Sequence, residues 1–182
     1  MIEQEIRKKT EIRDKLDRLK RIHFWLSERF SPMTDIMERK VMLAVHYDFN
    51  SLFKKWFGIL VENELEVDLD DEFTPLIQQN NHDIDYLYLS GGEKTAIALA
   101  YRLALNQVIN KLMNTIKTSD LLILDEPTDG FSEEQLDRVR ILLNELELQQ
   151  IIIVSHEAKV ESFVDHIIRF EKKDHVSSII YN

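Results

Sequence analysis

Two consecutive carboxylates, Asp125 and Glu126, end an apolar run and are followed by Pro127. The run, Leu121 to Leu124, predicts a buried strand, and open α/β sheets bind ligands at the carboxyl ends of their strands. Because side chains alternate across a strand, the two carboxylates can differ in role only if the backbone turns between them. Asp125 suits the magnesium of a nucleotide, held through water, and Glu126 suits a base for an attacking water. An acidic turn without chemistry is the alternative.

A histidine follows a second apolar run in the same way. The run Ile151 to Val154 predicts another buried strand, and Ser155 and His156 come directly after it. At that end of a sheet His156 is placed to contact a γ-phosphate or the attacking water, whereas a lone histidine is often purely structural. Its place at the end of a strand makes His156 a candidate for the same site.

Two glycines stand at the start of a long run of helix-forming residues. Ser90 and Glu93 flank them in the pattern of a capping box, in which each residue bonds the other's backbone N–H. Gly91 and Gly92 then fall in the first helical turn, where each costs about 1 kcal/mol relative to alanine. Their missing side chains would let an anion such as phosphate approach the unpaired N–H groups at the positive end of the helix dipole. A capped turn without a ligand is the alternative.

From Gly92 onward, segments with helical spacing of apolar residues alternate with all-apolar runs. The predicted order is a helix over 92–116, a strand over 121–124, a helix over 133–146 that Ser132 caps in a second capping box, a strand over 151–154, a short helix, and a strand over 166–170. Strands as apolar as 121–124 and 151–154 are typical of a parallel sheet buried on both faces. The predicted fold class is therefore α/β with parallel buried strands.

The N-terminal residues show the a/d spacing of a coiled coil. Positions four and three residues apart form a seam that weakens toward the N-terminus: Ile12, Leu16, Leu19, His23, Leu26 and Phe30. The pattern predicts a coiled-coil arm over 1–30, followed by a lobe over 31–182. An ordinary amphipathic helix packed on the lobe is the alternative.

The lobe is expected to begin with a second helix and two strands. Ser31 and Pro32 are expected to break the first helix, and Thr34 or Asp35 to cap a second one that ends at Gly58. Alternating apolar residues in ELEVDLD (64–70) and FTPLIQQ (73–79) then predict two half-buried strands, with Asp70 and Asp71 forming the turn between them.

Composition limits the function classes. The 182 residues carry a net charge of -10, so the chain as a whole does not favour polyanions, and any nucleic-acid contact must be local. No cysteine is present for disulfides or Cys-ligated zinc. The charged N-terminus does not resemble a signal peptide, and no apolar run approaches the ~20 residues that span a bilayer. We therefore expect a soluble, cytoplasmic protein without a membrane partner.

Three motifs in this order resemble those of a known ATPase class. LSGGEK, LLILDEPT and IIIVSHE are similar to the signature motif, Walker B motif and switch histidine of ABC-type ATPases. Glu93 in place of the usual glutamine points to the SMC-like branch. YLSGGEKTAIALAYRLAL and LDEPTDGF resemble the C-terminal half of the SMC-like ATPase of the archaeal double-strand-break repair nuclease complex, the Rad-fifty class. The resemblance covers Met1 to Asn182, with the specific motifs confined to Leu89 to Glu157.

The resemblance implies a role for each candidate residue. Asp125 would hold Mg²⁺ through water, Glu126 would orient and deprotonate the attacking water, and His156 would contact the γ-phosphate. The first turn of the signature helix would bind ATP held by a second head, through Ser90, Gly91, Gly92, Glu93 and Lys94. Lys94 and Arg102 match basic positions that relay nucleotide state, and Ser132 stands where the family usually has an aspartate.

Two elements of the family are absent from these residues. The four glycines, Gly58, Gly91, Gly92 and Gly130, cannot form the G-x-x-x-x-G-K-[ST] motif of a Walker A P-loop, and no cysteine is available for the family's zinc hook. The resemblance therefore implies the C-terminal lobe of an ABC-type ATPase head, which needs a separate N-terminal half that carries the P-loop. ATP and Mg²⁺ are the expected cofactors, and a second copy of the head is the expected partner in an ATP-dependent dimer.

The implied function is that of an ATPase in double-strand-break repair whose ATP-bound dimer separates on hydrolysis and regulates a partner nuclease. The nuclease subunit would dock at the base of the coiled coil through side chains such as Phe24, Trp25 and Phe30. DNA would meet a basic strip from Arg7 to Arg21. Two alternatives stay open: a chromosome-organising SMC head with a kleisin-like partner, and a regulatory ABC-like binding module without hydrolysis.

Overall fold

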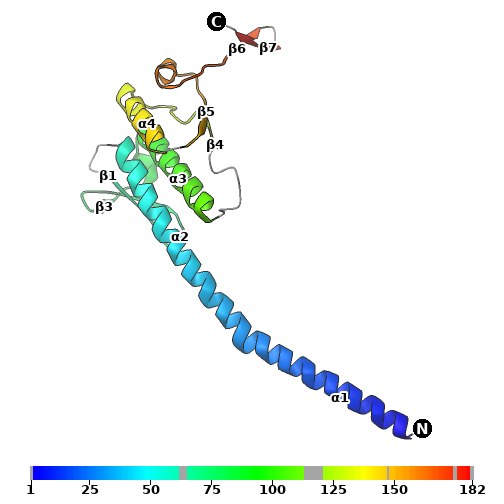
Figure 1. Cartoon of the computed structure of the whole chain (residues 1–182). Coiled ribbons are helices and arrows are strands. Elements are labelled where there is room, and N and C mark those ends of the chain that lie inside the picture. Colours follow the sequence, from blue (N-terminus) through cyan, green and yellow to red (C-terminus); the bar gives the residue numbers. More distant parts are fainter. Residues whose placement is uncertain (1, 62–64, 113–120, 147, 174–175, 181–182) are drawn as a thin grey trace. The chain divides into compact units, whose positions relative to one another are not determined.

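The computed structural model describes residues 2–61, 65–112, 121–146, 148–173 and 176–180 (Figure 1). The chain divides into two compact units, Met1–Tyr47 and Asp48–Asn182, and the predicted arm of residues 1–30 lies within the first. No helix among the described residues is long and apolar enough to cross a membrane.

The first unit is helical and does not break where the sequence predicts. Helix α1 (Ile2–Trp25) continues through a π-helical turn (Leu26–Phe30) into α2 (Ser31–Leu60), so the predicted break at Ser31 and Pro32 is wrong. Proline lacks an N–H and crowds the carbonyl four residues back. A π turn directly precedes this position, and in it the N–H of Ser31 donates to the carbonyl of Leu26, five residues back, so the helix continues with a local irregularity instead of ending.

The π turn also places two aromatic rings on one side of the helix. Trp25 and Phe30 stack with their ring centroids 5.5 Å apart. Thr34, a predicted cap, lies inside α2 and donates its hydroxyl to the carbonyl of Ser31 at 2.7 Å. The second helix is therefore an extension of the first, and it runs past Gly58 to Leu60.

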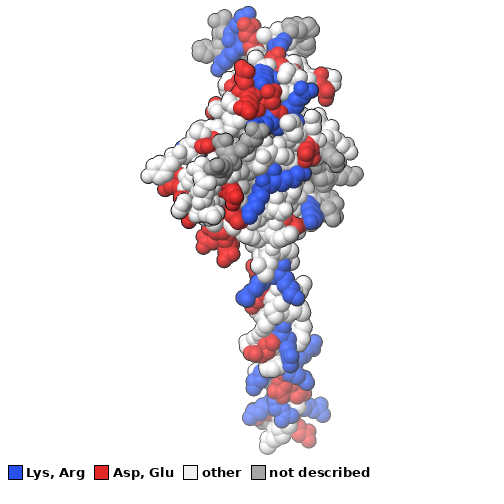
Figure 2. Space-filling view, turned by 90° about the vertical axis from the view of Figure 1, so that its left-hand side faces the viewer, with Lys and Arg blue, Asp and Glu red and all other residues white. Residues whose placement is uncertain are grey.

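Helix α1 has no buried residue. The predicted seam is exposed along its length, from Ile12 at 65% to Phe30 at 42%. Lys and Arg are interleaved with Asp and Glu along this helix (Figure 2). An apolar stripe between charged flanks is what a coiled-coil helix presents to a partner helix.

The second unit begins with the end of α2 and an antiparallel sheet. Strands β1 (Leu65–Leu69), β2 (Pro75–Gln79) and β3 (His82–Asp83) pair in that order, with Val67 opposite Ile77. The predicted turn is closed by Asp70, whose Oδ1 accepts from the N–H groups of Glu72 and Thr74 at 2.9 and 2.7 Å. The second predicted strand therefore starts at Pro75 rather than at Phe73.

Helix α3 (Gly91–Leu112) lies beside the end of α2 (Figure 1). The indole N–H of Trp56 donates to Oε1 of Gln107 at 3.0 Å, which joins the two helices in the core. Alanines on the buried face of α3, Ala96, Ala100 and Ala104, allow close packing. The predicted end of this helix at Ile116 lies outside the described residues.

A parallel strand pair follows, as the sequence predicts. Strands β4 (Leu121–Asp125) and β5 (Gln150–Val154) pair in parallel, joined by α4 (Glu133–Glu145). Burial on both faces, however, is not found in the described residues. Leu122 and Leu124 of β4 are 7% exposed, whereas Ile123 between them is 62% exposed and Val154 of β5 is 51% exposed. One face of the pair packs on the core and the other is an open apolar surface.

The C-terminal segment differs from the predicted single strand over 166–170. After a 3-10 helix (Ala158–Phe163), β6 (Arg169–Lys173) and β7 (Val176–Ile180) form an antiparallel hairpin, separate from β4 and β5. Charged and apolar residues alternate around Phe170, a pattern of antiparallel strands with one solvated face rather than of buried parallel strands. Arg169 ties the hairpin to Glu161 of the 3-10 helix at 2.6 Å.

Candidate functional site

The carboxyl ends of β4 and β5 bring two of the predicted catalytic residues together. Oε2 of Glu126 lies 2.9 Å from Nδ1 of His156, although the two residues are far apart in the sequence. The parallel register sets this distance, because Asp125 lies opposite Val154 and the N–H of Glu126 donates to the carbonyl of Val154 at 2.9 Å. Both side chains are solvent-accessible, His156 at 67% and Glu126 at 41%.

The backbone turns between the two carboxylates. Asp125 is the last residue of β4, and Glu126 has a φ of 43°, in the left-handed region that few residues other than glycine adopt. Such a conformation costs about 1 kcal/mol or more and persists only where surrounding contacts hold it. Glu126 therefore leaves the strand register while Asp125 keeps it, and this difference allows the carboxylates separate roles.

The donor set fits Mg²⁺ that is carried by a nucleotide. Among the described residues no group of three or more His, Cys, Asp or Glu side chains is arranged to hold a metal ion. Asp125 offers one exposed carboxylate at the end of a strand. Mg²⁺ is commonly bound in this way, through one or two carboxylates together with waters and substrate phosphates.

The predicted capping box at the start of α3 is present. Oε2 of Glu93 accepts from the N–H and the hydroxyl of Ser90, at 2.7 and 2.8 Å, and the N–H of Glu93 donates to Oγ of Ser90 at 3.3 Å. The Ser90 side chain and the Glu93 carboxylate are thus paired with each other. A phosphate that accepted from the Ser90 hydroxyl would replace Glu93 as its partner.

The two glycines of this turn have different surroundings. A Cβ added at Gly91 would meet nothing within 4 Å. A Cβ added at Gly92 would lie 2.6 Å from Oε1 of Gln135 and 3.2 Å from the carbonyl oxygen of Gly130. Gly91 thus leaves open space at the first turn of α3, whereas Gly92 allows a close contact inside the chain.

The basic side chains of α3 are also placed differently. Nζ of Lys94 donates to the carbonyl of Leu87 at 3.2 Å and lies 5.7 Å from the ring centroid of Tyr86, so it supports the 3-10 turn Tyr86–Tyr88. Arg102 is exposed farther along the same helix. The ammonium of Lys94 therefore has a local structural role as well as being a candidate for ligand binding.

The loop after the carboxylates is attached to the first turns of α3 and α4. The hydroxyl of Thr95 donates to the carbonyl of Asp129 at 2.8 Å, and Gly130 takes a φ of 76° where it faces Gly91 and Gly92. Ser132 caps α4 as predicted, since its Oγ accepts from the N–H of Gln135 at 3.2 Å.

Sequence reasoning missed three of these residues: Thr95, Gly130 and Gln135. The SEEQ pattern that ends at Gln135 indicates a helix cap but says nothing of its neighbour across the fold. No signal in the sequence pairs Thr95 with the loop. Gly130, which follows an aspartate, is a common turn signal that could have been used.

Sequence comparisons identify relatives in archaea, although no protein-family model matches the chain. A DNA double-strand break repair Rad50 ATPase from Sulfurisphaera tokodaii is 31% identical over 170 residues, which cover 90% of this chain and 18% of that protein. The Rad50 ATPase of Methanopyrus kandleri is 29% identical over 178 residues, or 93% of this chain and 19% of the relative. The chain thus spans about a fifth of the length of these curated relatives.

Solved structures agree on the fold. An Smc head domain with a coiled coil and joint from Pyrococcus yayanosii superposes with a TM-score of 0.70 at 21% identity, covering 96% of this chain and 34% of that one. A structure from work on ATP-driven dimerization of SMC ATPases gives a TM-score of 0.61 at 20% identity, covering 78% of this chain and 87% of that one. The resemblance predicted from the motifs is confirmed: the chain belongs with the archaeal Rad50 ATPases in sequence, and its fold is that of an SMC head domain with its coiled-coil helix.

Proposed function

We propose that the chain is the C-terminal part of an ATP-dependent DNA double-strand-break repair ATPase, in which ATP is bound between two heads. The observation that carries this proposal is the pairing of Glu126 with His156 at the carboxyl ends of two parallel strands. A solvent-accessible carboxylate held by an imidazole is suited to accept a proton from water.

Glu126 is the base in this proposal. Its carboxylate orients the attacking water and takes one proton from it as the water attacks the γ-phosphorus of ATP. His156 holds the carboxylate through Nδ1, and in the imidazolium form its Nε2 is a second donor, available to an oxygen of the γ-phosphate. Asp125 would hold, through water, the Mg²⁺ ion that neutralises charge on the phosphates.

The first turn of α3 binds the nucleotide of the other head. Gly91 provides open space at the N-terminus of a helix, where unpaired N–H groups favour an anion. Ser90 contributes its hydroxyl, and Lys94 is a neighbouring cation. Because two surfaces share one nucleotide, ATP holds the heads together, and hydrolysis removes the shared γ-phosphate that links them.

A separate N-terminal half completes the head. The residues of this chain cannot form a Walker A motif, so the phosphates of ATP need a P-loop from elsewhere. The open face of β4 and β5 supports the same idea, since Ile123, Ile152 and Val154 expose apolar side chains there. Apolar strands of a parallel sheet are normally covered on both faces, and the N-terminal half would supply the cover.

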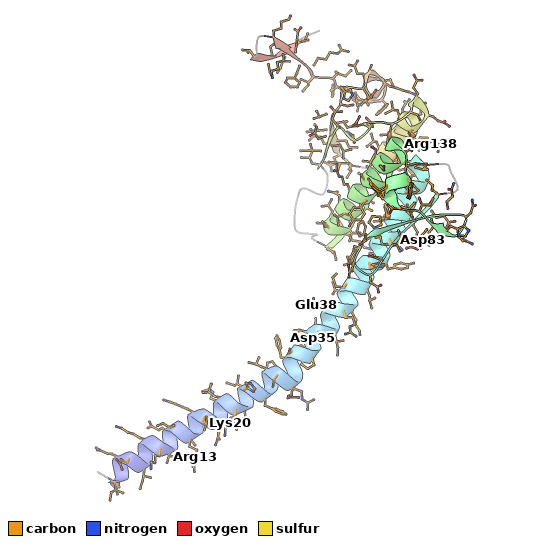
Figure 3. All side chains as sticks on the ribbon, turned by 180° about the vertical axis from the view of Figure 1, so that it is seen from behind. Arg13, Lys20, Asp35, Glu38, Asp83 and Arg138 are labelled. Carbon is orange, nitrogen blue, oxygen red and sulfur yellow. The ribbon has the colours of Figure 1, made fainter. Side chains whose placement is uncertain are left out.

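The arm contacts the other partners of the complex. Phe24, Trp25 and Phe30 are 60%, 55% and 42% exposed, and the stacked Trp25 and Phe30 form a rigid aromatic anchor for a helix of the repair nuclease. DNA binds to the basic strip from Arg7 to Arg21, which includes Arg13 and Lys20 (Figure 3).

The test mixes the chain with a purified N-terminal half that contains a P-loop, with and without ATP and Mg²⁺, and measures phosphate release. The proposal predicts release only from the two-chain mixture, and a matched Glu126→Gln chain should reduce it. If the chain instead stays a folded monomer that binds neither the N-terminal half nor ATP, a binding module is indicated. Capture of a winged-helix bridging protein rather than a nuclease on the arm would favour a chromosome-organising head.

A further inference from the structure

The side chain of Gln135 lies between the first turns of two helices. Its Oε1 accepts from the N–H of Ser132 at 3.0 Å and so caps α4. The same amide occupies the space beside Gly92 of α3, where an added Cβ would meet Oε1 at 2.6 Å and Nε2 at 3.1 Å. Gln135 therefore sets how closely the start of α4 can approach the start of α3.

The segment between Glu126 and Ser132 is held by two further hydrogen bonds. At one end, the N–H of Glu126 donates to the carbonyl of Val154 on β5 at 2.9 Å. In the middle, the carbonyl of Asp129 accepts from the Thr95 hydroxyl of α3 at 2.8 Å. A short segment fixed at both ends has little freedom, so its conformation, including the positive φ of Glu126, depends on where α3 and α4 hold it.

We propose that Gln135 is a positioning residue for Glu126. Its amide fixes the 127–132 segment against the first turn of α3, and this keeps Glu126 in the conformation that pairs with His156. The role in catalysis rests on the proposed function. If the first turn of α3 moves, for example when an anion binds beside Gly91, Gly92 displaces the Gln135 amide, and the amide in turn displaces the segment that carries Glu126.

The chemistry of the contact explains why a glutamine and a glycine meet here. Gln135 has the length and the acceptor that the Ser132 N–H requires, and glutamate shares both, whereas alanine has neither. Any side chain at Gly92 competes for the space of the amide and moves it away from Ser132. Substitutions on the two helices should therefore produce the same displacement of Glu126, although neither residue touches Glu126.

The test uses the whole 182-residue chain without nucleotide and reads the imidazole ¹H–¹⁵N resonances of His156, assigned with a His156→Gln variant. Glu126→Gln defines how far these resonances move when the carboxylate is lost. Gln135→Ala and Gly92→Ala are expected to produce most of that movement, with the double variant moving no farther than Gln135→Ala alone. Gln135→Glu should stay at the wild-type position, as should the control Asn144→Ala on the same helix.

Wild-type resonances in Gln135→Ala and Gly92→Ala, with stability lowered, would overturn the proposal and leave Gln135 a simple helix cap. If Gln135→Ala does not fold, Thr95→Val replaces it, because removing the Thr95 hydroxyl releases the same segment at Asp129 and should move His156 in the same direction. Because no ATP is present, failure here is distinct from failure of the proposed function, which would appear as no phosphate release from the wild-type two-chain mixture.

Discussion

The two adjacent glycines of α3 should respond in opposite ways to the same substitution. Gly91 and Gly92 both lie in the first turn of the helix, and neither has a positive φ. Alanine is favoured over glycine in a helix, so sequence rules alone predict equal stabilisation at the two positions. The structure predicts stabilisation by Gly91→Ala and destabilisation by Gly92→Ala.

The magnitudes follow from the contacts. Gly91→Ala meets nothing within 4 Å and should gain up to about 1 kcal/mol. Gly92→Ala has the same gain, but it displaces the amide of Gln135 and loses the hydrogen bond from the Ser132 N–H to that amide, at a cost of about 1 kcal/mol. The 3.2 Å approach to the carbonyl of Gly130, which has to move by a few tenths of an ångström, adds about 1 kcal/mol. The two variants should therefore differ by about 2 kcal/mol.

Urea unfolding followed by the fluorescence of Trp56 measures this difference. Trp56 is 1% exposed and reports on the core, and a Trp25→Phe background removes the signal of the exposed second tryptophan. With a slope of about 2 kcal/mol per molar urea, the midpoints should differ by about 1 M. Equal midpoints for the two variants would contradict this prediction, because Gly92 would then have no special contact to lose.

Two further predictions concern polar groups. The hydroxyl of Thr128 has no hydrogen-bond partner among the described residues although the residue is 1% exposed, so Thr128→Val should raise the free energy of unfolding by about 1 kcal/mol in urea titrations. The Lys54 ammonium, with Asn50 and a backbone N–H, holds the pKa of Asp68 below its usual value against the opposing effect of burial. Asp68 therefore stabilises the fold above its unfolded pKa of about 3.9, and this is lost as the pH falls through the lowered pKa. Asp68→Asn should cost less than about 1 kcal/mol at pH 7, because both partners are about half exposed, and less at pH 2 than at pH 7; a penalty that is equal at the two pH values would contradict this.

The parts of the fold that could be predicted are those with local signals. The capping boxes at Ser90 and Ser132 place both serines and their partners within one helical turn, and the structure has both boxes. The all-apolar runs 121–124 and 151–154 predict a parallel pair for the same reason, because the apolar composition and the length of each run are local features of the sequence. Placing Glu126 and His156 after these runs was enough to bring them together.

One error is local, because proline usually breaks a helix, whereas here a π turn directly before Ser31 and Pro32 lets the helix continue. The other errors arise where distant residues decide the outcome. Whether the second face of β4 is covered depends on other elements, and the apolar character of Ile123 does not specify them. The contact of Gly92 with Gln135 likewise joins helices that are far apart in the sequence, so the pattern of neither helix contains it.

We propose that Glu126 is the base of an ATPase whose nucleotide joins two heads. This role is best measured through the solution mass, together with phosphate release, of a two-chain head that carries Glu126→Gln, with and without ATP and Mg²⁺. We expect a mass that doubles only with ATP and stays doubled, while phosphate release falls by about 100-fold or more relative to wild type. Phosphate release at the wild-type rate, or a mass that ATP does not change, would contradict it.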